Sequence, residues 1–357
     1  MTTFDVAQRR LHNQRIAATT FENPADVVRW LGAVQAQDYL GSLWALGLRT
    51  RRSSEEAVER AVAAREFVRT WPLRGTLHYV AAEDVRWMLK LSASRTIARD
   101  ASRYRQLELD EATFAKTNRV LERALRGGKQ LTRPELAAAL ERAGVPTDGQ
   151  RLIHLLGRSS LEGLTCYAAR RGKQLTFALL DEWAPSAKRL GREEALAELA
   201  ARYFTSRGPA ALQDFVWWSG LTTADARAGL EAAKPRLVTE VSDGQTYWLS
   251  PSAPTAKDAK TTAYLLPAFD EYTVAYKDRS AVLHPSQASL VNPGGGMLSP
   301  TVVVGGQVVG TWRRELKKES VVITPFLFAK LKPAERHAVA AAARRYGEFL
   351  GMTVVPG

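Results

Sequence analysis

The feature that most constrains the fold of this chain is a recurring order of three helical patterns followed by short β runs. In the middle of the sequence, Thr132 is expected to cap a helix, and Glu135 three residues later completes a capping box. The turn after the first β run, Arg170-Arg171-Gly172-Lys173, has a glycine in a basic tip. Three helices closed by a basic hairpin describe a winged helix. The expected elements are helices over 116–125, 132–143 and 150–162, and strands over 165–169 and 174–178.

The same order occurs on either side of this unit. Near the N-terminus we expect helices over 6–18, 24–37 and 54–64 and a β-like run over 74–80. Later in the chain we expect helices over 193–206, 211–219 and 222–234, and a hairpin of 237–241 with 246–250. The predicted fold is mainly α with α+β elements. Its domains are winged helix 1 at 1–112, winged helix 2 at 113–186, winged helix 3 at 187–255, and a small C-terminal β-rich α+β domain at 261–357.

The composition changes after a linker over 251–260 that is rich in Pro, Ser, Ala and Lys. Gly305-Gly306 predicts a tight hairpin turn, and the second strand of that hairpin continues into Arg313-Arg314. The other expected elements of this domain are strands over 264–266, 301–304, 307–312 and 321–324, an amphipathic helix over 332–350, and a final run over 352–355.

The charge of the chain favours a polyanionic partner. Its 50 Lys and Arg residues exceed its 37 Asp and Glu residues, which gives a net charge of +13. Most of the basic residues are arginine, so a coding bias would raise the total in the same way. However, residues 49–105 and 310–346 together supply 12 of the 13 net charges. This concentration favours a basic surface, although a solvated charged face would give the same pattern.

Several classes of function are disfavoured by composition. The single cysteine, Cys166, excludes an internal disulfide and a zinc site built on paired thiolates. The five histidines show no close spacing, so we expect no metal and no other cofactor. No apolar run resembles a signal peptide or a membrane span, and we therefore expect a cytoplasmic protein.

The best lead to chemistry is a pair of glutamines, Gln35 and Gln37, at the end of the apolar stretch over 24–37. Read as a helix, this stretch places Gln35 on the same face as Val28 and Leu31, where a buried amide needs hydrogen-bond partners. Gln37 would then lie about 200° further round, so the helix must end or distort at Ala36 for both amides to converge. The alternative is that the pair caps a helix end or meets water there.

Four separated segments, in order along the chain, resemble the signatures of the tandem winged-helix family that includes the AlkZ-type DNA glycosylases. They are Val34-Gln35-Ala36-Gln37-Asp38; Arg69-Thr70-Trp71-Pro72-Leu73-Arg74-Gly75-Thr76-Leu77-His78; Leu265-Leu266-Pro267-Ala268-Phe269-Asp270-Glu271-Tyr272 with Tyr276-Lys277-Asp278-Arg279; and Val308-Val309-Gly310-Thr311-Trp312-Arg313-Arg314.

The resemblance implies a C-shaped molecule of three winged helices with a basic channel for duplex DNA. It also implies a monofunctional glycosylase that removes bulky N7-alkylated guanines, including those in interstrand crosslinks. Members carry Gln-x-Gln or Gln-x-Asp at the active site, and Gln35-Ala36-Gln37 matches the first type. The catalytic pair would be Gln35 and Gln37, which we expect to position the attacking water; Asp38 could assist or simply end a helix.

The resemblance and the basic stretches also nominate residues for DNA contact. They are Arg69, Trp71, Arg74, His78, Lys277, Arg279, Arg313 and Arg314. Several of them have a structural alternative: Trp71 as core, Arg74 in an internal ion pair, and His78 as a strand residue. The segments 269–272 and 277–279 could be structure that locks the last domain in place. Those two segments could instead stack on an exposed base.

Two functions follow from these patterns. In the first, the protein is a DNA repair glycosylase, a nucleoid-associated monomer that acts on double-stranded DNA with an alkylated guanine. No lysine stands beside the glutamine pair to form a Schiff base, so no lyase step is expected. In the second, the protein is a winged-helix DNA-binding regulator or lesion sensor without catalysis, which would not need the two glutamines in a water-accessible site.

Overall fold

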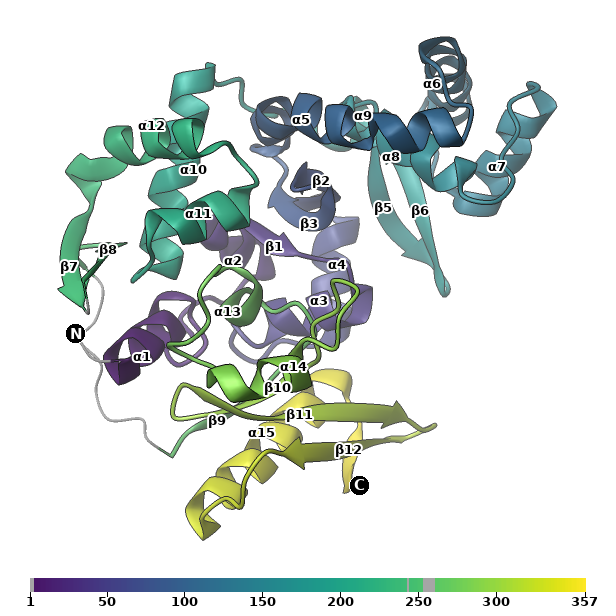
Figure 1. The fold of residues 1–357 in the computed structure, drawn as a ribbon. Coiled ribbons are helices and arrows are strands. Elements are labelled where there is room, and N and C mark those ends of the chain that lie inside the picture. Colours follow the sequence, from purple (N-terminus) through teal and green to yellow (C-terminus); the bar gives the residue numbers. More distant parts are fainter. Residues whose placement is uncertain (1–2, 243, 253–260) are drawn as a thin grey trace. The chain divides into compact units, whose positions relative to one another are not determined.

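The computed structural model describes residues 3–242, 244–252 and 261–357, so the expected linker lies mostly outside the described residues. Contacts between residues divide the chain into two compact units, both drawn in Figure 1. The inserted unit comprises Glu59–Ala195. The discontinuous unit comprises the residues up to Val58 together with Leu196–Gly357. The division into four domains stays a prediction.

The inserted unit contains an antiparallel sheet in which β3, β2, β5, β6 and β4 are neighbours in that order. Its apolar core lies between this sheet and its helices, with Leu121, Leu136 and Leu155 fully buried. The elements, including α4 that leads into the unit, are α4 (Glu55–Ala63), β2 (Phe67–Leu73), β3 (Thr76–Ala81), α5 (Val85–Gln106), α6 (Glu111–Leu125), β4 (Leu131–Thr132), α7 (Arg133–Arg142), α8 (Arg151–Leu161), β5 (Thr165–Arg171), β6 (Gln174–Leu179) and α9 (Leu180–Trp183).

The predicted order of helices and hairpin in this unit is confirmed. Thr132 caps α7, and its backbone N–H donates to the Glu135 carboxylate at 2.7 Å, as the capping box predicted. Helices α6, α7 and α8 are followed by the hairpin of β5 and β6, which turns at Gly172. The sequence did not predict α5 or β2, and the Trp71-Pro72 corner lies within β2, where the register with β3 is irregular.

The discontinuous unit combines N-terminal helices with everything after residue 195. None of the helices in the described ranges is both long enough and apolar enough to span a lipid bilayer. Its elements are α1 (Thr3–Asn13), α2 (Pro24–Leu31), β1 (Ala33–Gln35), α3 (Tyr39–Gly47), α10 (Arg192–Arg207), α11 (Leu212–Ser219), α12 (Thr223–Ala233), η1 (Lys234–Arg236), β7 (Val238–Ser242), β8 (Gln245–Leu249), β9 (Ala263–Leu266), α13 (Glu271–Val274), η2 (Pro285–Gln287), α14 (Ala288–Val291), β10 (Thr301–Val304), β11 (Gln307–Leu316), β12 (Ser320–Leu327), α15 (Pro333–Leu350) and β13 (Thr353–Pro356).

A five-stranded sheet in the order β13-β12-β11-β10-β9 forms the C-terminal part of this unit. Its strands lie where the sequence predicted them, but the sequence did not predict their order. Helix α15 packs on it through Tyr346, whose ring lies 5.2 Å from that of Trp312 on β11. Trp44 of α3 joins the same cluster, 5.1 Å from Tyr346, and its indole donates to the Leu265 carbonyl. Figure 1 shows β11 and β12 as a long hairpin that projects beyond the other strands of its sheet.

Two predicted helices are wrong at their C-terminal ends. The first was expected to reach Ala18 but ends at Asn13. The helix expected over 24–37 begins at Pro24, capped by the Asn23 side chain, and ends at Leu31. Gly32 ends it because its backbone has φ 73° and ψ −48°, a conformation that costs other residues strain. Ala33–Gln35 then form the short strand β1, so Gln35 does not lie on a helix.

Candidate functional site

The two glutamines lie on a short non-helical segment between α2 and α3. Gln35 is the last residue of β1 and is 7% exposed, which confirms the expected burial, whereas Gln37 is exposed. Asp38 is the N-cap residue of α3. A Cβ at Gly41 would lie 2.5 Å from the Asp38 carboxylate, so this glycine makes room for the carboxylate and does not end a helix. The segment thus offers one buried and one accessible amide.

The backbone of this segment is held by a buried ion pair between Arg207 and Glu271. The Arg207 guanidinium donates to the Leu31 carbonyl at 2.6 Å and to the Ala33 carbonyl at 2.7 Å. The Glu271 carboxylate accepts from the Gln35 backbone N–H at 2.9 Å through Oε1. Together the two side chains replace the partners that a continued helix would have supplied. We refer to Arg207 and Glu271 as the buried anchor.

The anchor is fully desolvated and fully used. Both side chains are 0% exposed, and Glu271 Oε2 accepts from Arg207 Nε at 3.0 Å and from Nη2 at 2.6 Å. The Trp218 indole N–H donates to the same oxygen at 2.9 Å, and the guanidinium lies 4.3 Å from the centre of the Trp218 ring. A buried carboxylate that accepts this many hydrogen bonds is held in one orientation. The Gln35 N–H that donates to it is therefore held in place as well.

A second buried ion pair stands beside the anchor. Arg49 binds Asp270 in bidentate fashion, with Nη1–Oδ2 at 2.9 Å and Nη2–Oδ1 at 2.8 Å, and both side chains are 0% exposed. The remaining guanidinium donors go to Gln14 and to the Ala45 carbonyl. Asp270 also caps α13 by accepting from the Tyr272 N–H at 2.9 Å. Asp270 thus makes buried structural contacts, and the role of segment 269–272 in locking the last domain in place stays a prediction.

Comparison with known proteins identifies the family. The sequence pattern of the family described as DNA glycosylase AlkZ-like matches residues 28–349. The chain belongs to the AlkZ-like DNA glycosylase family. It is 28% identical to an interstrand DNA cross-link repair glycosylase of Streptomyces sahachiroi, over 97% of this chain and 96% of that protein. The solved structure of the Streptomyces sahachiroi DNA glycosylase AlkZ has the same fold, with a TM-score of 0.79, 23% identity and complete coverage of both chains.

In this AlkZ-like chain, three of the residues nominated for DNA contact lie inside the inserted unit. Arg69 is 5% exposed and lies with its guanidinium 4.6 Å from the Tyr167 ring. Trp71 packs against the apolar core, 5.4 Å from the same tyrosine. His78 is fully buried, and its Nδ1 lies 2.9 Å from the Thr76 carbonyl. These positions support the structural alternative for Trp71 and His78; DNA contact by any of the three stays a prediction.

Arg74 occupies the turn between β2 and β3. Its φ of 56° is unusual for a residue with a side chain, and its carbonyl accepts from Arg99 Nη1 at 2.7 Å. The Arg74 side chain is half-buried.

Of the two residues nominated after α13, Lys277 is exposed and Arg279 is partly covered. Arg279 Nε donates to the Thr273 carbonyl at 2.7 Å, its guanidinium lies 5.9 Å from the Trp217 ring, and burial lowers its pKa from the usual value. Trp217 belongs to α11 and is 45% exposed, so an accessible aromatic ring lies beside the Arg279 cation.

Arg313 and Arg314 point to opposite faces of β11, as neighbours on a strand do. Arg313 is exposed and lies 5.2 Å from the Phe326 ring. Arg314 is half-buried and donates to the Tyr346 hydroxyl of α15. Of these two, Arg313 is therefore the one placed to meet a partner without rearrangement.

The sequence did not identify Arg207 or Trp218 as parts of the site. Glu271 was noticed only within a motif interpreted as structural. A buried arginine needs a carboxylate partner, but Arg207 lies 64 residues from Glu271 along the chain, and no local spacing links them. The one usable signal was the pair Asp270-Glu271 directly after the apolar strand β9 and its Pro267 turn.

Proposed function

We propose that this protein is a monofunctional DNA glycosylase that hydrolyses the N-glycosidic bond of bulky N7-alkylguanine, including guanines in interstrand crosslinks. Family membership supports glycosylase activity, and the cross-link repair glycosylase that it resembles supports the lesion class. The observation that carries the proposal is the Gln35–Gln37 segment: one amide is buried on an anchored backbone and the other is accessible to solvent.

The proposed chemistry needs orientation more than basicity. Alkylation at N7 makes the guanine cationic, so the base leaves with the bonding electrons of the C1′–N9 bond and becomes neutral. Water then bonds to a C1′ with oxocarbenium character and releases a proton. The carbonyl oxygens of Gln35 and Gln37 would accept the hydrogens of this water and hold its lone pair toward C1′. A neutral amide cannot be the base, so the proton goes to solvent or to Asp38.

The buried anchor supports this role for Gln35. Replacing a buried ion pair by apolar side chains is often neutral or stabilising, so stability alone is a weak reason for Arg207 and Glu271 to be there. Their hydrogen bonds to Leu31, Ala33 and Gln35 give another reason, because a catalytic amide must be held within a fraction of an ångström. We infer that the anchor positions the segment for the reaction.

The same proposal covers the partner and the outcome of the reaction. Arg207 and Glu271, the side chains that bind the backbone of the glutamine segment, cannot form a Schiff base, which favours simple hydrolysis over a lyase step. Double-stranded DNA would be held by three winged helices and the exposed Arg313 of the β11–β12 hairpin. A C-shaped arrangement, a monomeric state and a location at the nucleoid belong to this proposal.

The test uses duplex DNA with a single N7-alkylguanine, incubated with the purified protein and assayed for an alkali-labile abasic site. Gln37→Ala should bind adducted DNA normally and excise roughly 10²-fold more slowly, the usual effect of removing one transition-state interaction. The control is Gln213→Ala, which removes an exposed glutamine that lies on α11, outside the Gln35–Gln37 segment. Borohydride treatment should trap no protein–DNA adduct.

Two results would count against the proposal. An unchanged excision rate in Gln37→Ala would remove the glutamine from the mechanism. No abasic product from small or bulky adducts would favour a DNA-binding regulator or lesion sensor without catalysis.

A further inference from the structure

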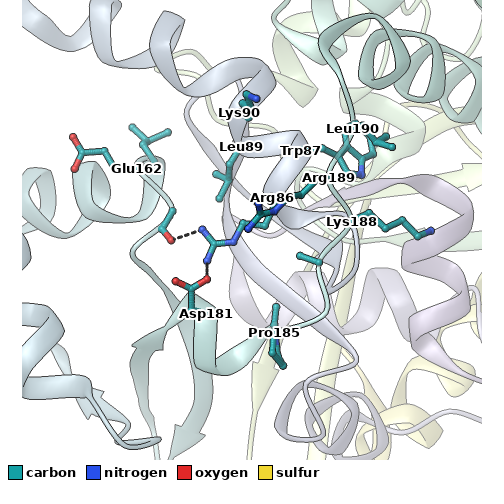
Figure 2. A pocket seen from close by; sticks show the side chains of 14 residues that line it. Arg86, Trp87, Leu89, Lys90, Glu162, Asp181, Pro185, Lys188, Arg189 and Leu190 are labelled. Atoms are coloured by element: carbon teal, nitrogen blue, oxygen red, sulfur yellow. Dashed lines mark hydrogen bonds and ion pairs between the residues drawn. The ribbon is translucent and has the colours of Figure 1, made fainter.

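The inserted unit contains a cavity of about 620 Å³ that involves none of the residues of the proposed reaction. It is bounded by the first turns of α5, the turn after α8 and the segment from Ala184 to Leu190 (Figure 2). This volume is in the range of small-molecule sites. Trp87, Leu89 and Pro185 give it apolar walls.

The frame of this cavity is fixed by hydrogen bonds. Arg86 reaches across it, donating from Nη1 to the Gly163 carbonyl at 3.0 Å and pairing through Nη2 with Asp181, as Figure 2 shows. On the other side, the Lys188 backbone N–H donates to the Glu83 carbonyl at 2.6 Å and ties the connecting segment to the start of α5. A wall that is already rigid lowers the entropic cost of ordering the protein when a ligand binds.

The charges around the cavity are unbalanced in favour of anions. Both of its carboxylates are occupied from within the unit: Asp181 pairs with Arg86, and Glu162 accepts from Arg158 Nε at 2.5 Å and from Asn118 at 2.6 Å. Three further cations line the cavity, and they are exposed and make no ion pair within the part of the chain that the structure describes. They are Lys90 on α5 and Lys188 and Arg189 on the connecting segment.

We propose that this cavity is a phosphate-binding site formed by Lys90, Lys188 and Arg189. Three cations at the rim of a concave surface attract an anion more strongly than the same charges spread on a flat face. The source favoured by the family of the chain is a backbone phosphate of DNA, bound in addition to the interactions at the reacting nucleotide. A free phosphate compound has the same chemistry and is the other source.

The DNA arm of the test measures the salt dependence of binding to undamaged duplex DNA. The triple variant Lys90→Gln/Lys188→Gln/Arg189→Gln should reduce the slope of log affinity against log salt by about 0.9, the value for one phosphate that is no longer neutralised. The matched control is Arg119→Gln/Arg123→Gln/Lys129→Gln, which removes the same charge from exposed positions of this unit outside the cavity. Its slope should stay closer to that of the wild type.

The second arm titrates wild-type protein and the cavity variant with inorganic pyrophosphate by calorimetry. A slope reduction specific to the cavity variant assigns the site to DNA. An unchanged slope with pyrophosphate binding only to the wild type confirms the phosphate site with a free ligand. Equal slope reductions in both triple variants, or no change in either arm, would overturn the proposal. Single-turnover excision at saturating DNA separates the test of this site from the test of the proposed reaction. Under that condition the cavity variant should excise the base at the wild-type rate.

Discussion

The sharpest perturbation of the proposed site is Glu271→Gln, which keeps the shape of the side chain but removes its charge and one acceptor. Two donors from Arg207 and the Trp218 indole N–H converge on Oε2, and the Gln35 N–H reaches Oε1. The single amide oxygen of glutamine will face the three donors. Its NH₂ group will then face the Gln35 N–H, where two donors cannot bond. The substitution therefore releases the end of β1.

The magnitudes follow from burial. Removing the charge from one side of a fully buried ion pair costs about 3–5 kcal/mol, and this includes about 1–3 kcal/mol for a buried N–H left unsatisfied. Domains of ordinary stability, about 5–15 kcal/mol, survive such a change at low temperature. The catalytic effect is separate: a displacement of the Gln35 amide by about 1 Å should slow excision roughly 10²-fold.

The neighbouring ion pair supplies a matched control. Asp270→Asn breaks a pair of the same type and burial, and we expect a similar decrease in the free energy of unfolding. Arg49, however, directs its other donors to Gln14 and Ala45 and not to β1. Asp270→Asn should therefore excise at nearly the wild-type rate, and Glu271→Asp should recover part of the rate that Glu271→Gln forfeits.

The assay combines denaturant unfolding with single-turnover excision at a temperature where all variants are folded. Saturating DNA makes the observed rate independent of affinity. If stability and excision rate fall in equal proportion in Glu271→Gln and Asp270→Asn, the anchor is structural only and the reasoning fails. A decrease in stability in both, with a slower rate in Glu271→Gln alone, supports positioning.

Two further predictions concern the hairpin and a buried tyrosine. Arg313→Gln should flatten the salt slope of DNA binding by about 0.9, whereas Arg314→Gln should mainly lower the melting temperature because it uncovers Tyr346; equal slope changes in the two variants would contradict this assignment. Burial raises the pKa of Tyr276 to about 12 from 10.0, so the unfolded chain loses this proton first and stability should fall by up to about 2–3 kcal/mol as pH rises from 10 to 12. Denaturant unfolding over that range should show a flatter alkaline limb in Tyr276→Phe, and an identical limb would exclude Tyr276 as its source.

The sequence predicted best where the determinants of structure are local. The helix capped by Thr132, the hairpin of β5 and β6 and the strand over 301–304 each follow from residues within a few positions of one another. Turn glycines and capping side chains act within one or two turns of backbone, so their effects can be read directly. The family signatures added the glycosylase class, which no single local pattern would have identified.

The sequence predicted poorly where residues far apart in the chain determine the local backbone structure or the burial of a side chain. The apolar periodicity over 24–37 favoured a helix through Gln37, but Gly32 ends the helix, and side chains from α10 and α13 then satisfy the released backbone groups. Similarly, Arg69 has a charge that suggests the surface, yet it lies buried against Tyr167 on another strand. Pairings across more than 90 residues leave no trace in helical or alternating patterns.

The need for an anchor follows from the spacing of the two glutamines. A continued helix would satisfy its own backbone groups, but it would separate side chains at positions 35 and 37 by about 200°. Extended backbone allows residues two apart to share a side, at the cost of leaving N–H and C=O groups without partners along the chain. Arg207 supplies the missing donors for the Leu31 and Ala33 carbonyls, and Glu271 supplies the missing acceptor for the Gln35 N–H. If the reaction requires amides at positions 35 and 37, the chain must leave the helix before them. The non-helical segment then requires a buried ion pair such as Arg207–Glu271 to satisfy its backbone groups.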